Sequence, residues 1–230
     1  MPTAVITGAS RGLGRATAHA LAQRGWSLVV DARRPDLLAG AMHGLAGVTA
    51  LPGDVTDPAH RTRLAAEVHR AGRLDLLVNN ASRLGPSPQP ELLGYPLDEL
   101  PRVYETNVFA PLALIQLLAG PLAAAAGTVV NVSSDAATEA YPGWGGYGSA
   151  KAALDQLTAV LGAEQPSLRC YAFDPGDMRT DLHQRAFPGE DISDRPGPEA
   201  AAAALLRLVT ERPPSGRYRA GNLSVLAVSS

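Results

Sequence analysis

The stretch TAVITGASRGLG (residues 3–14) is the strongest indication of the fold in this sequence. Its first five residues, TAVIT, form an apolar, β-rich run that predicts a strand, and a helical pattern follows from Leu13. Gly8, Gly12 and Gly14 lie at the turn between them. Glycine permits a tight turn there, and the backbone N–H groups at the start of a helix can bind a pyrophosphate. The stretch therefore predicts a dinucleotide-binding βα unit.

The same alternation of strand and helix continues along the chain. Most predicted strands are continuous apolar runs, as expected for strands that are covered on both faces. Repeated alternation indicates right-handed βαβ units and a parallel sheet. We therefore predict an α/β protein with a single doubly wound Rossmann-type domain over residues 1–230, a parallel seven-stranded sheet and helices on both faces. The predicted strands are residues 3–7, 27–32, 48–54, 74–80, 127–134, 168–175 and 223–228, and the predicted helices are residues 13–24, 35–44, 59–71, 97–125, 147–163 and 198–212.

Composition narrows the possible partners. Hydrophobic residues make up 46% of the 230 residues and charged residues 18%, which indicates a compact folded protein. A formal charge of −2 offers no electrostatic reason to expect a nucleic acid or an anionic membrane as partner. The single cysteine, Cys170, excludes a disulfide framework and is predicted to be a buried thiol. We predict a cytoplasmic protein without signal peptide, membrane span or metal site, whose histidines lie on helix surfaces or loops: His19, His43, His60, His69 and His183.

Two proline- and glycine-rich segments interrupt the alternation. Residues 83–96 follow the fourth predicted strand, and residues 179–198 follow the sixth. Loops of this length inside a compact domain are usually functional or mobile. We predict that residues 181–198 form a substrate flap.

The end of the second strand, VVDARR, bears on the choice of cofactor. An acid at this point binds the ribose hydroxyl groups of NAD, whereas an arginine accommodates the phosphate of NADP. Two registers are open: Asp31 as the ribose acceptor, or Ala32 at that position with Arg33 beside the phosphate. Arg11 in the glycine turn can bind the same phosphate from the other side. NADP(H) is favoured and NAD(H) remains possible.

Seven motifs now occur in a recognisable order. They are TGASRGLG, GDV (53–55), NNAS (79–82), TNVFAP (106–111), NVSS (131–134), YGSAK (147–151) and DPGDMRT (174–180). In this order and spacing the chain resembles the short-chain dehydrogenase/reductase family, in its shorter, single-domain branch. The resemblance covers nearly the whole chain. It implies an oxidoreductase that transfers a hydride between NADP(H) and a carbonyl or alcohol substrate.

The resemblance implies a catalytic set of Asn107, Ser134, Tyr147 and Lys151. Tyr147 would be the general acid in carbonyl reduction and the base in alcohol oxidation. Lys151, the only lysine among 20 basic residues, lies one helical turn further along. A positive charge about 5 Å from the phenol is expected to lower its pKa by about two units. The resemblance also implies that Lys151 binds the nicotinamide ribose.

Two of these assignments carry an alternative. Ser134, 13 residues before Tyr147, would hold the substrate oxygen, and Ser133 is the alternative. Strand alternation is expected to send the two serine side chains to opposite sides, so that one can serve. Asn107 would help to hold a water molecule linked to Lys151, and it would also satisfy a local helix irregularity.

The motifs imply further contacts. Asn79 is either a cofactor contact or a buried amide between strands, and Ser82 stands where the family usually has glycine, a departure that we expect to touch no chemistry. Substrate contacts are predicted at Tyr141, Trp144 and Leu182. The implied cofactor contacts are Gly8, Ser10, Arg11, Gly12, Leu13, Gly14, Arg33, Asp54, Val55, Asn80, Ala81, Tyr147, Lys151, Pro175, Gly176, Met178 and Thr180.

The alternative function is a non-catalytic NADP(H)-binding sensor or scaffold protein. An incomplete catalytic set would favour it, and here the set is complete. The family also implies a homodimer, and the apolar run AALDQLTAVL in the predicted helix 147–163 suits such an interface. The chain ends RAGNLSVLAVSS, without the Asp-Gly-Gly-type ending common in family tetramers, so a tetramer stays open.

Overall fold

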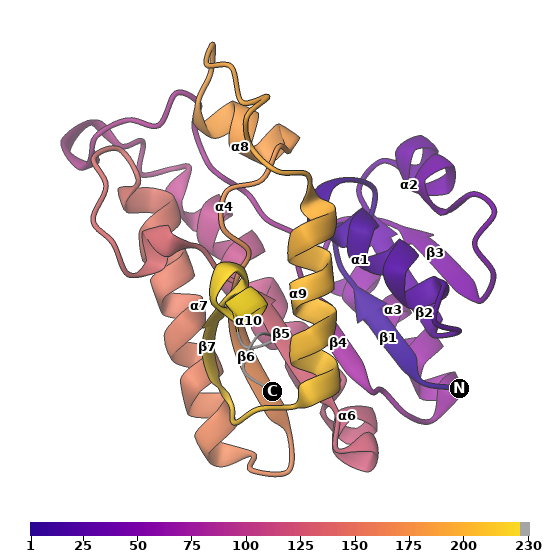
Figure 1. Cartoon of the computed structure of the whole chain (residues 1–230). Helices are drawn as coiled ribbons and strands as arrows, with labels where there is room; N and C mark the ends of the chain where they lie inside the picture. The colour runs from indigo at the N-terminus through magenta and orange to yellow at the C-terminus, as the bar shows by residue number, and fades with distance from the viewer. Residues whose placement is uncertain (226–230) are drawn as a thin grey trace.

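The computed structural model describes residues 1–225 and has a seven-stranded sheet at its centre (Figure 1). Every neighbouring pair of strands is parallel, and the order across the sheet is β3-β2-β1-β4-β5-β6-β7. This confirms the predicted α/β class and the doubly wound Rossmann-type sheet. The strands are β1 (Thr3–Ile6), β2 (Ser27–Ala32), β3 (Val48–Pro52), β4 (Leu76–Asn79), β5 (Thr128–Val132), β6 (Arg169–Asp174) and β7 (Gly216–Arg219).

Helices cover both faces of the sheet. They are α1 (Gly12–Ala22), α2 (Pro35–Met42), α3 (Pro58–Ala71), α4 (Leu100–Tyr104), α5 (Ala110–Leu117), α6 (Ala119–Ala125), α7 (Gly145–Glu164), α8 (Asp181–Ala186), α9 (Pro198–Glu211) and α10 (Ala220–Val225). Alternate side chains of β1 enter different cores: Ala4 and Ile6 pack with α1 and α9, and Val5 packs with α3 and α5. Figure 1 shows α1 and α9 side by side on their face.

The helix predicted over residues 97–125 is divided. A π-helical turn, η2 (Glu105–Phe109), separates α4 from α5, and it contains Asn107. Turns of this kind occur often at functional sites. The chain then bends by 64° between Leu100–Leu117 and Ala119–Ala125. Within residues 1–225 no single helix is long and apolar enough to cross a membrane, and this bent pair meets the criterion by length and composition alone.

The seventh strand is not where the sequence predicts it. The prediction of a strand at 223–228 is wrong for residues 223–225, which end α10, and residues 226–228 lie outside the described part of the chain. The strand is β7, GRYR, whose residues alternate between half-buried and exposed. Its composition does not indicate a strand. It is a strand because it pairs in parallel with β6 at the edge of the sheet.

Four connections meet at the carboxyl ends of the strands. They are the glycine turn between β1 and α1, the loop after β4, the loop after β5 with its 3-10 helix η3 (Asp135–Ala137), and the segment after β6 that contains α8. The strand order reverses between β1 and β4, and ligands of open parallel sheets bind at such a point. The flap at 181–198 and a single domain over residues 1–230 stay predictions.

Candidate active site

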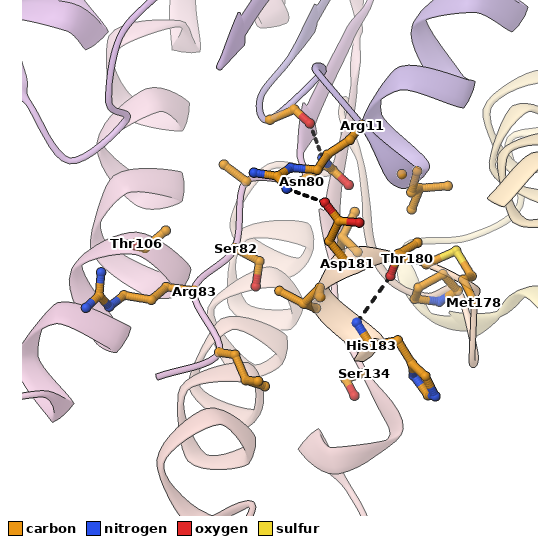
Figure 2. A pocket seen from close by; sticks show the side chains of 18 of the residues that line it. Arg11, Asn80, Ser82, Arg83, Thr106, Ser134, Met178, Thr180, Asp181 and His183 are labelled. Atoms are coloured by element: carbon orange, nitrogen blue, oxygen red, sulfur yellow. Dashed lines mark hydrogen bonds and ion pairs between the residues drawn. The ribbon is translucent and has the colours of Figure 1, made fainter. Parts of the chain in front are cut away.

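A cavity of about 530 Å³ opens where these connections meet. Figure 2 shows it lined from the glycine turn, the loop after β4 and the segment around α8. Nearly all predicted cofactor contacts line it, together with Ser134, Tyr147 and Lys151. Three predicted site residues do not: Gly14, Asn107 and Tyr141.

The glycine turn has the geometry that a pyrophosphate requires. Gly8 and Gly12 have φ angles of +69° and +52°, which side chains other than glycine rarely adopt. The N-cap residue of α1, Arg11, makes no side-chain capping hydrogen bond, and the first turn of α1 has no acidic residue. The positive end of the helix is therefore available to an anion in the cavity.

Gly14 serves packing rather than ligand contact, which corrects its predicted role. A Cβ atom at Gly14 would lie 2.6 Å from the carbonyl oxygen of Gly8 and 2.5 Å from Nδ2 of Asn80. Asn80 in turn donates hydrogen bonds from Nδ2 to the carbonyl oxygens of Thr7 (2.8 Å) and Gly8 (3.2 Å). Gly14 thus allows α1 to approach the turn that Asn80 supports.

Asp31 lies beneath the glycine turn and is only 1% exposed. Its Oδ1 accepts a hydrogen bond of 2.8 Å from the Gly8 N–H group, and its Oδ2 lies 3.0 Å from Nε2 of His60. Burial raises the pKa of Asp31, and the hydrogen bonds from His60 and Gly8 oppose this shift. Each carboxylate oxygen thus has one hydrogen-bond partner, and Asp31 also lines the cavity together with Ala32 and Arg33. Both registers at the end of β2 stay open.

The prediction that His60 is a surface or loop histidine is wrong. His60 is 0% exposed, and its ring packs so closely on Gly53 that a Cβ atom there would lie 2.2 Å from Nδ1. A nitrogen of the Arg63 guanidinium lies 3.1 Å from the same Nδ1. Because arginine can only donate, Nδ1 is the acceptor and Nε2 carries the proton that Asp31 accepts.

We expect His60→Leu to reduce the free energy of unfolding by about 3 kcal/mol, because it leaves the buried Asp31 carboxylate with the Gly8 N–H group alone. Urea unfolding monitored by circular dichroism measures the change. His43→Leu is the matched control, since His43 is exposed, and it should change stability little. A loss as small as that of the control would mean that His60 does not stabilise Asp31.

Three guanidinium groups lie at the end of the cavity nearest β2 and α1. Arg34 is paired with Asp36 at 2.8 Å. Arg11 is paired with Asp181 of the flap, and Figure 2 shows this contact across the cavity. Arg33 lines the cavity, is exposed and makes no ion pair within residues 1–225. An anion in the cavity can therefore pair with Arg33 directly. It can pair with Arg11 only if the surface ion pair between Arg11 and Asp181 breaks.

Tyr147 and Lys151 lie one turn apart on α7, near the helix start at Gly145. Their residues are 5% and 2% exposed, and Nζ of Lys151 lies 5.5 Å from the centre of the Tyr147 ring. The ammonium group donates a hydrogen bond of 2.7 Å to the carbonyl oxygen of Val132, the last residue of β5. This confirms the prediction that both side chains share one helix face.

Ser134 follows β5 and caps η3. Its Oγ donates to Oδ1 of Asp135 (3.0 Å) and accepts from the Ala136 N–H group (3.2 Å). Ser133 is 2% exposed, and its Oγ lies 3.5 Å from the carbonyl oxygen of Ser134. Both serines line the cavity. That their side chains point to opposite sides stays a prediction, since β5 ends at Val132, before both residues.

Asn107 is 1% exposed and ties η2 to the loop after β4. Its Oδ1 accepts from Ser82 Oγ (2.9 Å) and from the Arg83 N–H group (3.1 Å), and its Nδ2 donates to the Arg83 carbonyl oxygen (2.7 Å). The helix irregularity expected at this residue is confirmed. The expectation that the serine at position 82 touches no chemistry stays a prediction.

Comparisons with known proteins decide the family. A family model described as short chain dehydrogenase matches residues 2–191. Sepiapterin reductase of Mus musculus is 35% identical over 199 residues, which is 79% of this chain and 76% of that protein. The alcohol dehydrogenase of the archaeon Thermococcus sibiricus, complexed with 5-hydroxy-NADP, is 27% identical with a TM-score of 0.83 and 95% of both chains covered. A short chain dehydrogenase of Shigella flexneri 2a, complexed with NADP, is 25% identical with a TM-score of 0.87, covering 96% of this chain and 97% of that one.

The chain belongs to the short-chain dehydrogenase family. It is therefore an oxidoreductase that uses NAD(P) and acts on CH–OH and C=O groups of small molecules.

In this short-chain dehydrogenase, burial dominates the titration of the Tyr147–Lys151 pair. Burial raises the pKa of Tyr147 to about 12; hydrogen bonding with Ser82 lowers it, and the charges of Asp135 and Asp174 raise it further. Burial also lowers the pKa of Lys151 to about 8. The prediction that Lys151 brings the phenol pKa down by about two units is wrong for this structure. The largest cause is the cost of removing the phenolate from water, and Lys151 is not among the groups that shift the pKa of Tyr147.

We expect Lys151→Met to stabilise this dehydrogenase by about 2 kcal/mol at pH 7, because it removes a buried charge. The pKa of Lys151 falls from 10.5 to about 8 on burial, so the cost is present in full below pH 8. Between pH 8 and 10.5 the folded form releases its proton while the unfolded form keeps it, so the wild type gains stability. The advantage of the methionine variant should shrink across that window.

Urea unfolding at pH 7 and pH 10 tests this expectation. Arg15→Met is the control, because Arg15 is exposed on α1, and its effect should not depend on pH in this range. A Lys151→Met protein no more stable than the wild type at pH 7 would contradict the assigned cost.

The substrate end of the dehydrogenase is aromatic. Trp144 and Leu182 line the cavity as predicted, and the ring of Trp144 lies 5.8 Å from that of Phe187 in the flap. Tyr141 corrects the prediction: its hydroxyl group donates to Glu139 at 2.6 Å, and its ring stands edge-on to Trp144 outside the cavity. Tyr141 therefore contacts the cavity wall through Trp144. Phe187 thus packs against the same aromatic wall that lines the cavity.

Several lining residues were missed from the sequence. Asp135 and Asp181 each directly follow a predicted site residue, and that adjacency was the available signal. Asn79, left open, is structural: its Nδ2 donates to Oδ1 of Asn131 at 2.8 Å between β4 and β5. Cys170 is a buried free thiol, as predicted, and burial raises its pKa to about 11. No group of three or more His, Cys, Asp or Glu residues within the described chain is arranged to hold a metal ion.

Proposed function

We propose that this short-chain dehydrogenase interconverts a ketone or aldehyde and its alcohol with NADP(H), and that Tyr147 transfers the proton. The observation that carries the proposal is the shared cavity: Tyr147, Lys151 and Ser134 line one end, and the uncapped glycine turn lines the other. A phosphate-binding turn and a buried proton donor are thus joined by one continuous space.

Each residue has a defined task in this proposal. Tyr147 is neutral at physiological pH, since burial raises its pKa to about 12, so it is poised to donate its proton to the oxygen of a carbonyl group. Ser134 can donate to the same oxygen if its hydroxyl group leaves Oδ1 of Asp135. Lys151 provides a fixed donor beside the phenol, held by Val132. The nicotinamide of a bound NADPH supplies the hydride.

The preference for NADP(H) over NAD(H) rests on the charges near β2. Arg33 and Arg11 can both approach the 2′-phosphate, and their planar guanidinium groups suit it. Asp31, which would serve a free ribose hydroxyl group, is only 1% exposed and already accepts hydrogen bonds from Gly8 and His60, whereas Arg33 is exposed. The NADP complexes of the structural relatives support the same choice.

The test is consumption of NADPH and of NADH with a panel of aromatic and aliphatic ketones and aldehydes. We expect turnover with NADPH on at least one aromatic carbonyl compound, given the aromatic wall around Trp144. NADPH binding without turnover across the whole panel would overturn the proposal. It would favour the alternative, a non-catalytic NADP(H)-binding sensor or scaffold protein.

A homodimer is also proposed. Phe109, Leu117 and Val160 are large apolar residues exposed at 52%, 39% and 41% around α5 and α7. These residues suit an isologous interface between two copies. Sedimentation equilibrium tests this, and a monomer at micromolar concentration would contradict it. The end of the chain, which bears on a tetramer, lies outside the described residues. The cytoplasmic location stays a prediction.

A further inference from the structure

The structure assigns a positioning role to Arg217 of β7, whose guanidinium group holds the carbonyl oxygen of Ser134 and thereby fixes where the Ser134 hydroxyl group lies. Ser134 lines the cavity (Figure 2), whereas Arg217 does not and belongs to none of the seven sequence motifs. The inference rests on the proposed function, in which the Ser134 hydroxyl group donates to the substrate oxygen.

The register of the sheet brings Arg217 to the carboxyl ends of the strands. Arg217 lies opposite Ala172 of β6. Two residues further along, Arg219 lies opposite Asp174, the last residue of β6. Alternate residues of a strand share a face, so the two arginines extend from the same face of β7. Because α7 packs beside β7 (Figure 1), Arg217 is within reach of β6, of α7 and of the loop after β5.

Two carboxylates orient the guanidinium group of Arg217. Its Nε donates to Oδ2 of Asp155 on α7 at 3.0 Å, and its Nη2 donates to Oδ2 of Asp174 at 3.3 Å. The side chains of the two acids are only 15% and 2% exposed. Carboxylates that are removed from water need a cation beside them, and the planar fork of arginine can serve two of them in different directions. The acids therefore hold the guanidinium group in one orientation.

The carbonyl oxygen of Ser134 accepts a third hydrogen bond from the same guanidinium group, at 2.8 Å from Nη2. Nη2 carries two hydrogens, so it can donate to Ser134 and to Asp174 together. Nε carries one hydrogen, which Asp155 accepts. The three contacts thus use three separate hydrogens and do not compete.

Sheet pairing alone does not fix the Ser134 peptide. Beyond the end of β5, the Ser133 N–H group donates to the carbonyl oxygen of Phe173 at 2.7 Å. The Ser134 carbonyl oxygen also accepts from the Ala137 N–H group at 3.1 Å, but Ala137 belongs to η3, which Ser134 itself caps. The contact with Arg217 ties this turn to β7, on the side away from β5.

The expected effect of Arg217 on the reaction is positional. Without it, the Ser134 peptide can tilt about the hydrogen bond between Ser133 and Phe173, which moves the Ser134 hydroxyl group away from the substrate oxygen. Displacement of a reacting or stabilising group by about 1 Å can reduce a rate 100-fold. We expect Arg217→Met to lower kcat by about 10-fold and to change KM little, because Ser134 acts on the charge that develops in the transition state.

A double-mutant cycle tests whether Arg217 acts through Ser134. Ser134→Ala alone should lower kcat by about 100-fold. In the Ser134→Ala background, Arg217→Met should cost less than about 2-fold, because residues that act as a unit are not additive. A loss of the same size in both backgrounds would mean that Arg217 only supports the fold, and it would overturn the inference.

Arg219→Met is the matched control. Arg219 lies on the same strand at 3.7 Å from Oδ2 of Asp174, and within residues 1–225 it makes no hydrogen bond with Ser134. Its removal should change kcat by less than about 2-fold. If Arg217→Met does not fold, Arg217→Lys takes its place: it keeps a cation beside the two acids, but an ammonium group lacks the fork that serves three acceptors. Full activity of Arg217→Lys would overturn the role assigned to the fork.

A second readout needs no turnover. When serine is labelled with ¹³C at the carbonyl carbon and aspartate with ¹⁵N, the described chain has two labelled peptide bonds, Ser134–Asp135 and Ser193–Asp194. In Arg217→Met the Ser134 carbonyl resonance should move upfield, because its oxygen loses a charged donor. The Ser193 resonance is the internal control and should stay in place. An unchanged Ser134 resonance in the full chain without substrate would overturn the inference.

The two proposals fail separately. A Ser134 resonance that moves in a protein that reduces no carbonyl compound supports the contact with Arg217 and sinks the proposed function. Turnover that depends on Tyr147, combined with additive effects of Arg217→Met and Ser134→Ala, supports the function and sinks the positioning role.

Discussion

Tyr147→Phe is expected to lower kcat/KM for carbonyl reduction by about 10³-fold, because phenylalanine offers no proton to the substrate oxygen. The ring itself should stay in place, since Tyr147 is buried and packs edge-on against Trp144 at 5.8 Å. NADPH binding should therefore persist, which fluorescence titration can check. Steady-state kinetics with each substrate found in the panel measures the loss.

The matched control is Tyr141→Phe. Tyr141 is 40% exposed, lies outside the cavity and donates to Glu139, so removing its hydroxyl group should leave kcat/KM nearly unchanged. Equal activity of Tyr147→Phe and the wild type would remove Tyr147 from the mechanism.

The phenol of Tyr147 also sets the direction of the pH dependence. Reduction needs the protonated phenol, and with a pKa raised to about 12 it should stay active into the alkaline range. Oxidation needs the phenolate, so its rate should rise with pH instead, up to tenfold per pH unit. Initial rates in both directions between pH 6 and pH 10 compare the two.

Arg33→Asp is expected to shift the ratio of NADPH to NADH affinity by about 100-fold toward NADH. The substitution removes the exposed guanidinium group from the 2′-phosphate and supplies a carboxylate that repels it and can accept from ribose hydroxyl groups. In the wild type the Asp31 carboxylate is only 1% exposed and already accepts from His60 and Gly8, so the introduced carboxylate would be the more accessible of the two.

Dissociation constants for both nucleotides, measured by quenching of tryptophan fluorescence, test this shift. Arg34→Ala is the control: Arg34 is already paired with Asp36 and should alter the ratio much less. If Arg33→Asp leaves the ratio unchanged, the phosphate must be bound elsewhere, with Arg11 as the remaining guanidinium in the turn.

Much of the fold was predictable because buried parallel strands leave an obvious trace in the sequence. Runs such as SLVVDA are mostly apolar and are bounded by helix signals, so β2 was placed correctly at residues 27–32. β7 left no such trace. Its four residues include two arginines, and its identity depends on pairing with β6, which composition does not report. The more apolar residues 223–225 lie in α10 instead.

The site shows the same limit at the level of single side chains. Tyr147 and Lys151 could be related by helical spacing, since four residues make about one turn. The contact between Asp31 and His60 could not be predicted in this way. It joins β2 to α3 across 29 residues, and the sequence around neither residue is unusual. The pKa of Tyr147 was predicted in the wrong direction, since charge spacing was visible in the sequence and the depth of burial was not.

The contact between Arg11 and Asp181 spans 170 residues of sequence, yet both side chains are more than half exposed, at 54% and 68%. Such pairs are weak in water. The segment around α8 is held in place mainly by apolar packing. Leu182 and Ala186 pack against Leu84, Ala136 and Tyr147. Apolar burial of this kind is not weakened by charge screening, and it weakens on cooling. Added salt should therefore leave this packing in place, whereas cooling should weaken it.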